Sequence, residues 1–241
     1  MKISEAIISS VFPARCAVCD RLLSGGEYLC GDCKGLIVSP ASKKRRCEIC
    51  FMPLEDCLCG KRLFYKKLAF PFFNEELPRK AVHRLKFRHR LDLVLPFARL
   101  MTAALEQRDM LKDCDIITFV PMSRGAKFRR GYNQAQLLAQ KISEISKIEC
   151  TGLLTKTGGT KTQHSLNYIF RSGNPLGVYE PIAALTDKFK DKTVLIADDI
   201  VTSGATLNEA AKTLLIFGAK KVYCVSALAT KKKKAKKEKS D

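Results

Sequence analysis

Short apolar runs alternate with amphipathic segments along most of this chain. Three runs are predominantly apolar: residues 115–120, 193–197 and 220–228. Runs of this kind are typical of strands buried on both faces of a parallel sheet. Residues 133–146 instead have helical periodicity, which places four apolar residues on a core-facing side: Leu137, Leu138, Ile142 and Ile145. Strands that alternate with helices predict an α/β fold, a parallel sheet flanked by helices.

Weaker patterns predict the other elements. Residues 68–73 are predicted to form an edge strand, because Pro71 lacks the N–H group that a central strand needs. Residues 75–87 and 91–107 are predicted to form helices. Pro96 could kink the second helix, because proline cannot donate a backbone hydrogen bond. Shorter patterns predict strands at 150–154 and 176–179, a helix at 207–217, a loop at 155–163, a helical turn at 165–172 and an amphipathic helix at 3–12.

Eight of the eleven cysteines form closely spaced pairs near the N-terminus. They are Cys16, Cys19, Cys30, Cys33, Cys47, Cys50, Cys57 and Cys59. Two such pairs on tight turns make a closed tetrahedral sulfur site with a structural role. The count predicts two zinc ions in a double zinc ribbon, and zinc is favoured because iron–sulfur spacings differ. The spacing leaves open which pairs share an ion, and the single residue between Cys57 and Cys59 leaves the second site less certain than the first.

Cysteine spacing and charge bear on compartment and partners. Metal-type spacing indicates a reducing compartment, the cytoplasm, and no apolar stretch approaches transmembrane length. Glu5 and Arg15 argue against a signal peptide. The net charge is +19, of which residues 231–241 contribute +5. The basic remainder indicates an anionic partner such as nucleic acid, an anionic membrane or a polyphosphate, unless the organism simply favours lysine.

These patterns divide the chain into three parts. We expect an N-terminal helix and zinc ribbon over residues 1–65, an α/β domain over residues 66–230, and a disordered lysine-rich tail over residues 231–241. The basic run at 43–46 is either a solvated turn or a nucleic-acid contact.

The strongest chemical signal is the stretch VLIADDIVTSGAT at residues 194–206. Asp198 and Asp199 follow the predicted strand at its carboxyl end, the edge where open α/β sheets bind ligands. A small hydroxylated loop comes next, made of Thr202, Ser203, Gly204, Ala205 and Thr206. Its N–H groups and hydroxyls, with the N-terminus of the following helix, suit a phosphate. A phosphate cradle beside two carboxylates fits a ribose phosphate, whose 2′ and 3′ hydroxyls would meet the acids, with a divalent cation nearby.

Two basic stretches accompany this motif. Residues 120–135 gather Arg124, Lys127, Arg129 and Arg130 beyond the strand at 115–120, where they are placed to bind a pyrophosphate. Residues 155–174 carry Lys156, Lys161 and Arg171 in a predicted loop that closes over a phosphorylated ligand. For both stretches the alternative is a solvated surface loop.

Residues 194–206 resemble the 5-phosphoribosyl-1-pyrophosphate (PRPP) binding motif of type I phosphoribosyltransferases at all thirteen positions. Nearly the whole chain resembles the ComF family, in which a double zinc ribbon joins such a domain and which is associated with DNA uptake in natural transformation. The matching positions beyond the cysteines are HRLKF at 83–87, Val120 and Pro121, RGYNQA at 130–135, and Thr162, Gln163, Leu166, Arg171 and Asn174. Lys156 and Tyr179 stand where the family usually has arginine and phenylalanine.

The resemblance implies a type I phosphoribosyltransferase fold that binds PRPP or a related ribose 5-phosphate, with Mg²⁺. Asp198 and Asp199 are then the catalytic pair, and the implied PRPP contacts also include Thr202, Ser203, Gly204, Ala205, Thr206, Arg124, Arg130, Lys156 and Arg171. The implied role is DNA uptake, with uptake-machinery proteins as partners. One alternative is a metabolic enzyme that transfers 5-phosphoribosyl to a base or amine; another is a zinc-ribbon nucleic-acid module with a degenerate partner domain. No residue pattern defines an acceptor pocket, so catalysis is left open.

The charge also predicts binding of single-stranded DNA with little sequence preference and strong salt dependence. Its basis is the lysine tail and the basic residues at 43–46 and 79–90. Phe87, Phe128 and Tyr132 are candidates for base stacking, although we expect Phe87 to lie in the core.

Overall fold

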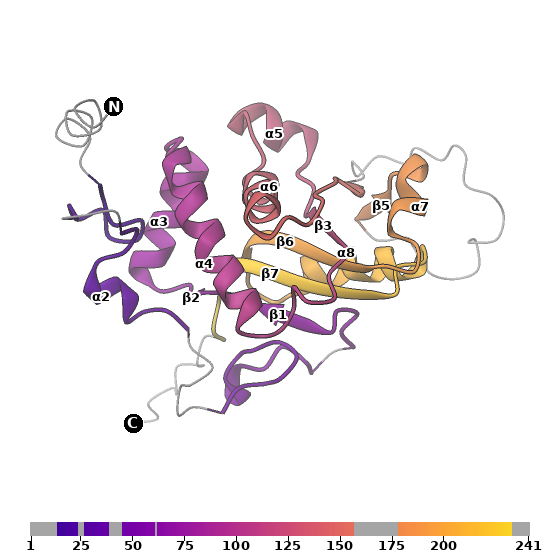
Figure 1. The fold of residues 1–241 in the computed structure, drawn as a ribbon, viewed down its shortest axis with the longest axis horizontal. Coiled ribbons are helices and arrows are strands. Elements are labelled where there is room, and N and C mark those ends of the chain that lie inside the picture. Colours follow the sequence, from indigo (N-terminus) through magenta and orange to yellow (C-terminus); the bar gives the residue numbers. More distant parts are fainter. Residues whose placement is uncertain (1–13, 24–26, 39–44, 61, 157–177, 233–241) are drawn as a thin grey trace, which may run out of the picture.

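A parallel sheet lies at the centre of the computed structural model, which describes residues 14–23, 27–38, 45–60, 62–156 and 178–232 (Figure 1). Its strand order is β1–β7–β6–β3, and β2 also pairs with β7. The strands are β1 (Lys67–Ala69), β2 (Phe72–Phe73), β3 (Ile116–Phe119), β6 (Thr193–Val201) and β7 (Lys221–Ala229). Every pair in this sheet is parallel, which confirms the predicted α/β fold.

The predicted edge strand at 68–73 is split in two. Lys67 lies opposite Tyr223 and Phe72 opposite Leu228, so β1 and β2 follow one another along the same edge of β7. Between them, Pro71 has no N–H to donate, and its carbonyl accepts a 2.8 Å bond from Val38 instead. The proline therefore interrupts the strand as well as confining it to the edge.

Helices cover both faces of the sheet. The helices α3 (Glu76–Phe87), α4 (Val94–Glu106) and α6 (Gln134–Ser146) pack on one face, and α7 (Thr186–Phe189) and α8 (Ala205–Ile216) on the other. Along β6, Leu195 and Ala197 belong to the first core, while Val194 and Ile196 belong to the second. A strand buried on both faces needs this uninterrupted apolar run.

Three details of the helices and strands differ from expectation. Pro96 is the third residue of α4, after a 3-10 helix η2 (Leu91–Leu93), and it makes no mid-helix kink because first-turn N–H groups have no helical partner. Ile145 is 36% exposed, whereas Ala135 and Ala139 are buried beside Leu138. The strand predicted to end at residue 197 continues to Val201, because Asp198 and Val201 remain paired with β7.

A separate two-stranded antiparallel sheet joins β4 (Leu154–Lys156) to β5 (Tyr179–Pro181). The strand predicted at 150–154 is wrong in position, because Cys150 makes only an isolated bridge to Ile117. A 3-10 helix η4 (Ala183–Leu185) follows β5. The expected elements at 3–12 and 165–172, and the loop beyond residue 156, lie outside the described residues.

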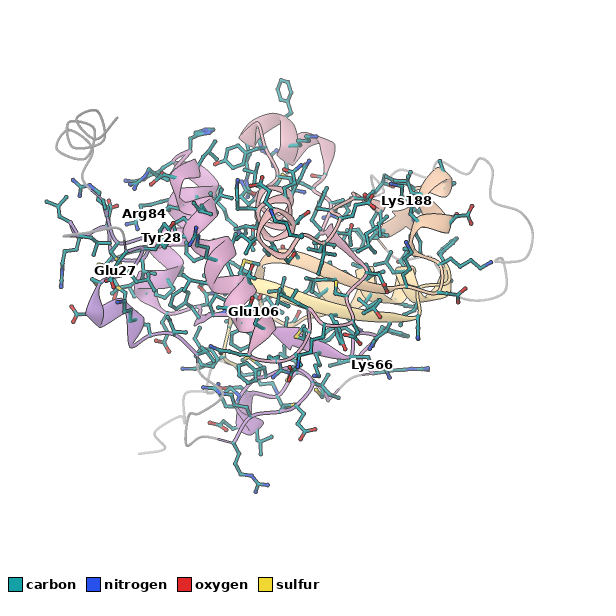
Figure 2. All side chains as sticks on the ribbon, in the orientation of Figure 1. Glu27, Tyr28, Lys66, Arg84, Glu106 and Lys188 are labelled. Carbon is teal, nitrogen blue, oxygen red and sulfur yellow. The ribbon has the colours of Figure 1, made fainter. Side chains whose placement is uncertain are left out.

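The two cysteine-rich segments dock at separate places on the α/β domain (Figure 1). The first, with α2 (Gly31–Lys34), lies beside α3, where Arg84, labelled in Figure 2, donates a 2.9 Å bond to the carbonyl of Val18. The second, with a 3-10 helix η1 (Leu54–Asp56), lies next to β1, and Arg108 stacks 4.3 Å from the ring of its Phe51. Each segment contributes to a different core of the α/β domain, so a boundary at residue 65 remains a prediction. None of the described helices has the length and apolar character needed to cross a membrane.

Candidate functional site

Two adjacent carboxylates, Asp198 and Asp199, lie near the carboxyl end of β6. The backbone N–H of Asp199 donates a 2.8 Å bond to the carboxylate of Asp198. Asp199 forms a 2.7 Å ion pair with Lys86 of α3, and both side chains are largely buried, at 14% and 17% exposed. The acid pair therefore has a cation supplied by a helix more than a hundred residues earlier in the chain.

Lys86 is the site residue that the sequence prediction missed. It lies within the HRLKF stretch that carried part of the family resemblance, but nothing in its local pattern distinguishes it from the other basic residues of α3. Only the packing of α3 beside β7 and the first core brings its ammonium to the acid pair.

The electrostatics of Asp198 differ from those of an ordinary aspartate. Burial and the neighbouring charge of Asp199 raise the pKa of Asp198 to about 8, against the smaller opposing effects of the Asp199 N–H, Lys86 and Lys156. Two carboxylates this close do not readily ionise together. The pair is therefore prepared for a ligand that donates hydrogen bonds, such as the hydroxyls of a ribose, or for a cation.

Asp198 also approaches β5 and β7. Its charge contributes, after burial, to raising the pKa of Tyr179 to about 12, and the same two effects raise the pKa of the Cys224 thiol. Neither neighbour supplies a positive charge, so the cations acting on this carboxylate come from α3 and β4.

We expect Asp198→Asn to stabilise the ligand-free protein at alkaline pH. The pKa of Asp198 is higher in the folded protein than in the unfolded chain, so folding favours the protonated carboxyl. This contribution to the free energy of unfolding is complete below pH 4 and is lost as the pH rises towards about 8. The variant has no carboxyl to titrate at this position, so its stability lacks this dependence on pH. At pH 8 it should be more stable than wild type by on the order of 1–2 kcal/mol. Urea unfolding at several pH values from 5 to 8 measures this; parallel profiles for both proteins would contradict it.

The hydroxylated loop after β6 forms a cradle at the start of α8. Thr202, Ser203, Ala205 and Thr206 are exposed, whereas Gly204 is buried with φ +76° and is the residue that precedes the helix. This left-handed conformation favours glycine. The first N–H groups of a twelve-residue helix lack helical partners and carry its positive dipole, so the cradle suits an anion.

Gly204→Ala should weaken phosphate-ester binding and lower stability. An added Cβ would lie 3.4 Å from the Tyr65 hydroxyl and 3.6 Å from Leu58, which is tolerable, so the cost of about 1–2 kcal/mol comes from the left-handed backbone. Gly125→Ala is the matched control, since its Cβ meets nothing within 4 Å. Thermal unfolding and ribose 5-phosphate affinity should both fall in the first variant alone; equal behaviour of the two would be inconsistent with this geometry.

The stretch at 120–135 that is predicted to bind a pyrophosphate includes a short helix. Residues 124–130 form α5 (Arg124–Arg130), because Ser123 accepts a bond from the Ala126 N–H at its start and Gly131, at φ +77°, ends it. Both capping residues act locally and set the two ends of this helix. Asn133 then caps α6 and donates a 3.0 Å bond to the carbonyl of Val120.

The structure does not bring all the predicted basic residues to the acid pair. Lys156, at the end of β4, acts on Asp198 through its charge. The guanidinium of Arg130 instead lies over the ring of Phe87, 4.8 Å from its centroid, and donates to Gln134 at 3.3 Å. The backbone of Arg124 begins α5, and Arg171 lies outside the described residues.

The second cysteine segment forms one side of the phosphate cradle. Asn208 of α8 accepts a 2.7 Å bond from the N–H of Phe64 and donates a 3.1 Å bond to the carbonyl of Arg62. A cavity of about 700 Å³ lies between this segment and the cradle; its lining includes Cys57, Leu58, Leu63, Thr202, Ser203 and Lys232. Residues 57–60 and 62–64 therefore support the loop that is predicted to hold the phosphate.

The cysteines form two clusters, each with its sulfur atoms within 4.8 Å of one another. Cys16, Cys19, Cys30 and Cys33 make the first cluster, and Cys47, Cys50, Cys57 and Cys59 the second. The short Cys57–Cys59 spacing therefore does not prevent a fourth ligand from joining the second cluster. This settles the grouping that the spacing had left open, and four converging thiols fit a closed tetrahedral metal site.

Both clusters contain the same type of turn. Asp20 and Phe51, each four residues after the first cysteine, have positive φ, and the first cysteine pairs across the turn with Arg21 or Met52. Burial alone raises the pKa of the Cys16 and Cys47 thiols, but bonds from backbone N–H groups outweigh it and lower the pKa of each to about 7. A thiol that ionises near neutral pH is prepared to ligate a metal.

Purified protein should hold two zinc ions per chain. Elemental analysis after extensive dialysis measures the number, and a finding of iron, or of a folded protein without metal, would contradict the assignment. Cys57→Ser should reduce the content towards one zinc, because the first cluster shares none of its ligands.

Comparison with known proteins places the whole chain in a family. A family model described as phosphoribosyl transferase domain matches residues 128–241. Competence protein F of Haemophilus influenzae is 30% identical over 211 residues, covering 86% of each chain. The chain belongs to the ComF family. DNA utilization protein YhgH of Escherichia coli K12 is 28% identical over 216 residues, covering 87% of this chain and 88% of that protein.

Membership of the ComF family confirms the expected combination of a phosphoribosyltransferase domain with N-terminal cysteine clusters. Among solved structures, a purine phosphoribosyltransferase from Pyrococcus horikoshii is 18% identical and covers 58% of this chain and 84% of that chain. Its TM-score of 0.33 is too low to support any inference about this ComF protein.

Proposed function

We propose that this ComF-family protein binds PRPP, or a closely related ribose 5-phosphate, together with Mg²⁺, and that it acts in DNA uptake as a binder of single-stranded DNA. Asp198 and Asp199 meet the ribose 2′ and 3′ hydroxyls, and the cradle from Thr202 to Thr206 holds the 5-phosphate. Lys86 and Lys156 offset the charge of the acid pair and of the pyrophosphate. Arg124, Arg130 and Arg171 are further candidate contacts.

One observation carries this proposal more than any other: the acid pair at the end of β6 is followed directly by the anion cradle, and the two favour different chemical groups. The carboxylates favour hydroxyls or a cation, whereas the glycine turn and the start of α8 favour an anion. A ribose phosphate satisfies both at once, which a free nucleobase or an inorganic anion does not.

Mg²⁺ would supply charge neutralisation of the pyrophosphate when bound, and this chain's own residues would do the rest. The cradle orients the 5-phosphate, the acid pair orients the ring, and Lys86 holds Asp199 in place. If transfer occurs, leaving-group departure at the anomeric carbon needs charge stabilisation and no covalent nucleophile.

The grounds for a role with DNA are separate from those for PRPP binding. The relatives named Competence protein F and DNA utilization protein match along most of the chain, and the net charge is +19. A basic surface of this size favours nucleic acid through counterion release. Zinc in the cysteine clusters and a cytoplasmic location are part of the same proposal.

A strain that lacks the gene tests the role. Loss of transformation without a nucleotide requirement is the expected result, whereas a nucleotide requirement with normal transformation would overturn the proposed role and favour a metabolic phosphoribosyltransferase. Pyrophosphate release from PRPP, measured across a panel of bases and amines, then decides whether the protein is an enzyme or a binding protein.

A further inference from the structure

Two phenylalanines on the described surface are unusually exposed. Phe128, on α5, is 92% exposed, and Phe87, at the end of α3, is 53% exposed. The expectation that Phe87 lies in the core was therefore wrong. Among the large apolar side chains that are exposed in the described parts of the chain, these two are the aromatic ones. A single exposed phenylalanine is ordinary, but two exposed aromatic rings on adjacent elements make this part of the surface a candidate contact site.

Contacts between aromatic and basic side chains join these elements into one surface. The ring of Phe87 lies between His83, 4.6 Å away between centroids, and the guanidinium of Arg130, 4.8 Å away. His89 meets Tyr132 edge-on at 5.5 Å, and the Tyr132 hydroxyl donates a bond to the carbonyl of Leu85. The end of α3 and the α5–α6 connection are thus held side by side; we call this the α3–α5 surface.

The α3–α5 surface is strongly basic. Residues 77–91 and 116–143, which provide it, contain no aspartate or glutamate. On α3, Arg79, His83 and Phe87 are spaced four residues apart, so they share one helical face. Arg88, Lys127 and Arg129 add exposed charge on the two elements. Such a surface complements a polyanion.

The surface is also continuous with the acid pair. Lys86, directly before Phe87, forms the 2.7 Å ion pair with Asp199. The end of α3 therefore lies next to the acid pair that we assign to PRPP binding.

We propose that the α3–α5 surface binds single-stranded DNA, with bases stacked on Phe87 and Phe128 and phosphates held by the surrounding arginines and Lys127. This inference rests on the proposed function, because it names where DNA binds. Paired bases bury their faces within the duplex, whereas bases of a single strand are free to stack on a ring. Arginine beside an aromatic ring adds a flat cation that a stacked base can also contact.

The test compares two oligonucleotides of equal length, one of deoxythymidines and one abasic, with four proteins. These are the full chain, Phe87→Ala with Phe128→Ala, Arg88→Ala with Arg129→Ala, and the control Phe64→Ala. Phe64 also packs against cations, Arg62 at 5.4 Å and Lys212 at 5.9 Å, but lies outside the surface. Fluorescence anisotropy gives the affinities, and circular dichroism with thermal unfolding verifies that each variant is folded.

Wild type should prefer the thymidine strand, and the double phenylalanine variant should lose about ten-fold or more of affinity for it while binding the abasic strand as before. The arginine variant should bind both strands more weakly than wild type, and its affinity should depend less steeply on salt concentration. The control should match wild type.

Two results would overturn the proposal in different ways. If wild type binds the thymidine strand but the phenylalanine variant binds it equally well, this surface is not the DNA site, and the proposed function stands. If wild type binds neither strand, the DNA part of the proposed function fails together with this surface.

Discussion

Cys47→Ser should strongly weaken PRPP binding, whereas Cys16→Ser should leave it nearly unchanged. Both variants are expected to lose one metal ion and some thermal stability, because each removes a ligand from a four-cysteine cluster. Only the second cluster holds the segment that contacts the phosphate cradle, through Leu58 beside Gly204. Affinity in the Cys47 variant should fall by at least about ten-fold, the equivalent of about 1.4 kcal/mol.

Calorimetry with PRPP and Mg²⁺ measures the difference, and elemental analysis verifies the metal content of each variant. Leu58→Ala is a milder companion, since it keeps all four cysteines and should weaken binding less. Equal losses of PRPP affinity in the Cys16 and Cys47 variants would show that the second segment does not support the cradle specifically.

Lys86→Met should cost about 3 kcal/mol of stability and weaken PRPP binding strongly, because it leaves the largely buried carboxylate of Asp199 without its cation. Lys86→Met combined with Asp199→Asn should recover most of the stability, since neither charge is then left alone. The double variant should still bind PRPP poorly, because the cation and the charged carboxylate that accepts from the ribose hydroxyls are both missing.

Urea unfolding of the two single variants and the double variant forms a complete cycle. A coupling energy near zero would mean that the ion pair contributes nothing to folding. Lys86→Arg is the conservative control and should retain part of both stability and affinity.

The parts of the site that the sequence predicted are those that a local pattern specifies. Asp198, Asp199 and Gly204 lie within thirteen consecutive residues, and the strand, turn and helix around them follow from the order of apolar and small side chains. The parallel sheet followed from the same apolar runs. Cysteine spacing predicted the two clusters, although only the folded chain shows which pairs meet.

The parts that were not predicted depend on contacts distant in sequence. Phe64 meets Asn208 across 144 residues, and Lys86 meets Asp199 from another element altogether. The exposure of Phe87 has the same origin: its spacing suits a core position, but α5 and its arginine, not a core layer, pack beside it. The helix at 124–130 was not predicted, because the residues that cap it, Ser123 and Gly131, act over only a few positions.

The most direct test of PRPP binding at the end of β6 is calorimetry on Asp198→Ala with Asp199→Ala, measured with and without Mg²⁺. The matched control, Glu48→Ala with Asp187→Ala, removes the same charge from two exposed positions. Wild type and the control should bind PRPP, more tightly with Mg²⁺, and the acid-pair variant should show no binding. Unchanged affinity in the acid-pair variant would contradict the assignment of this site.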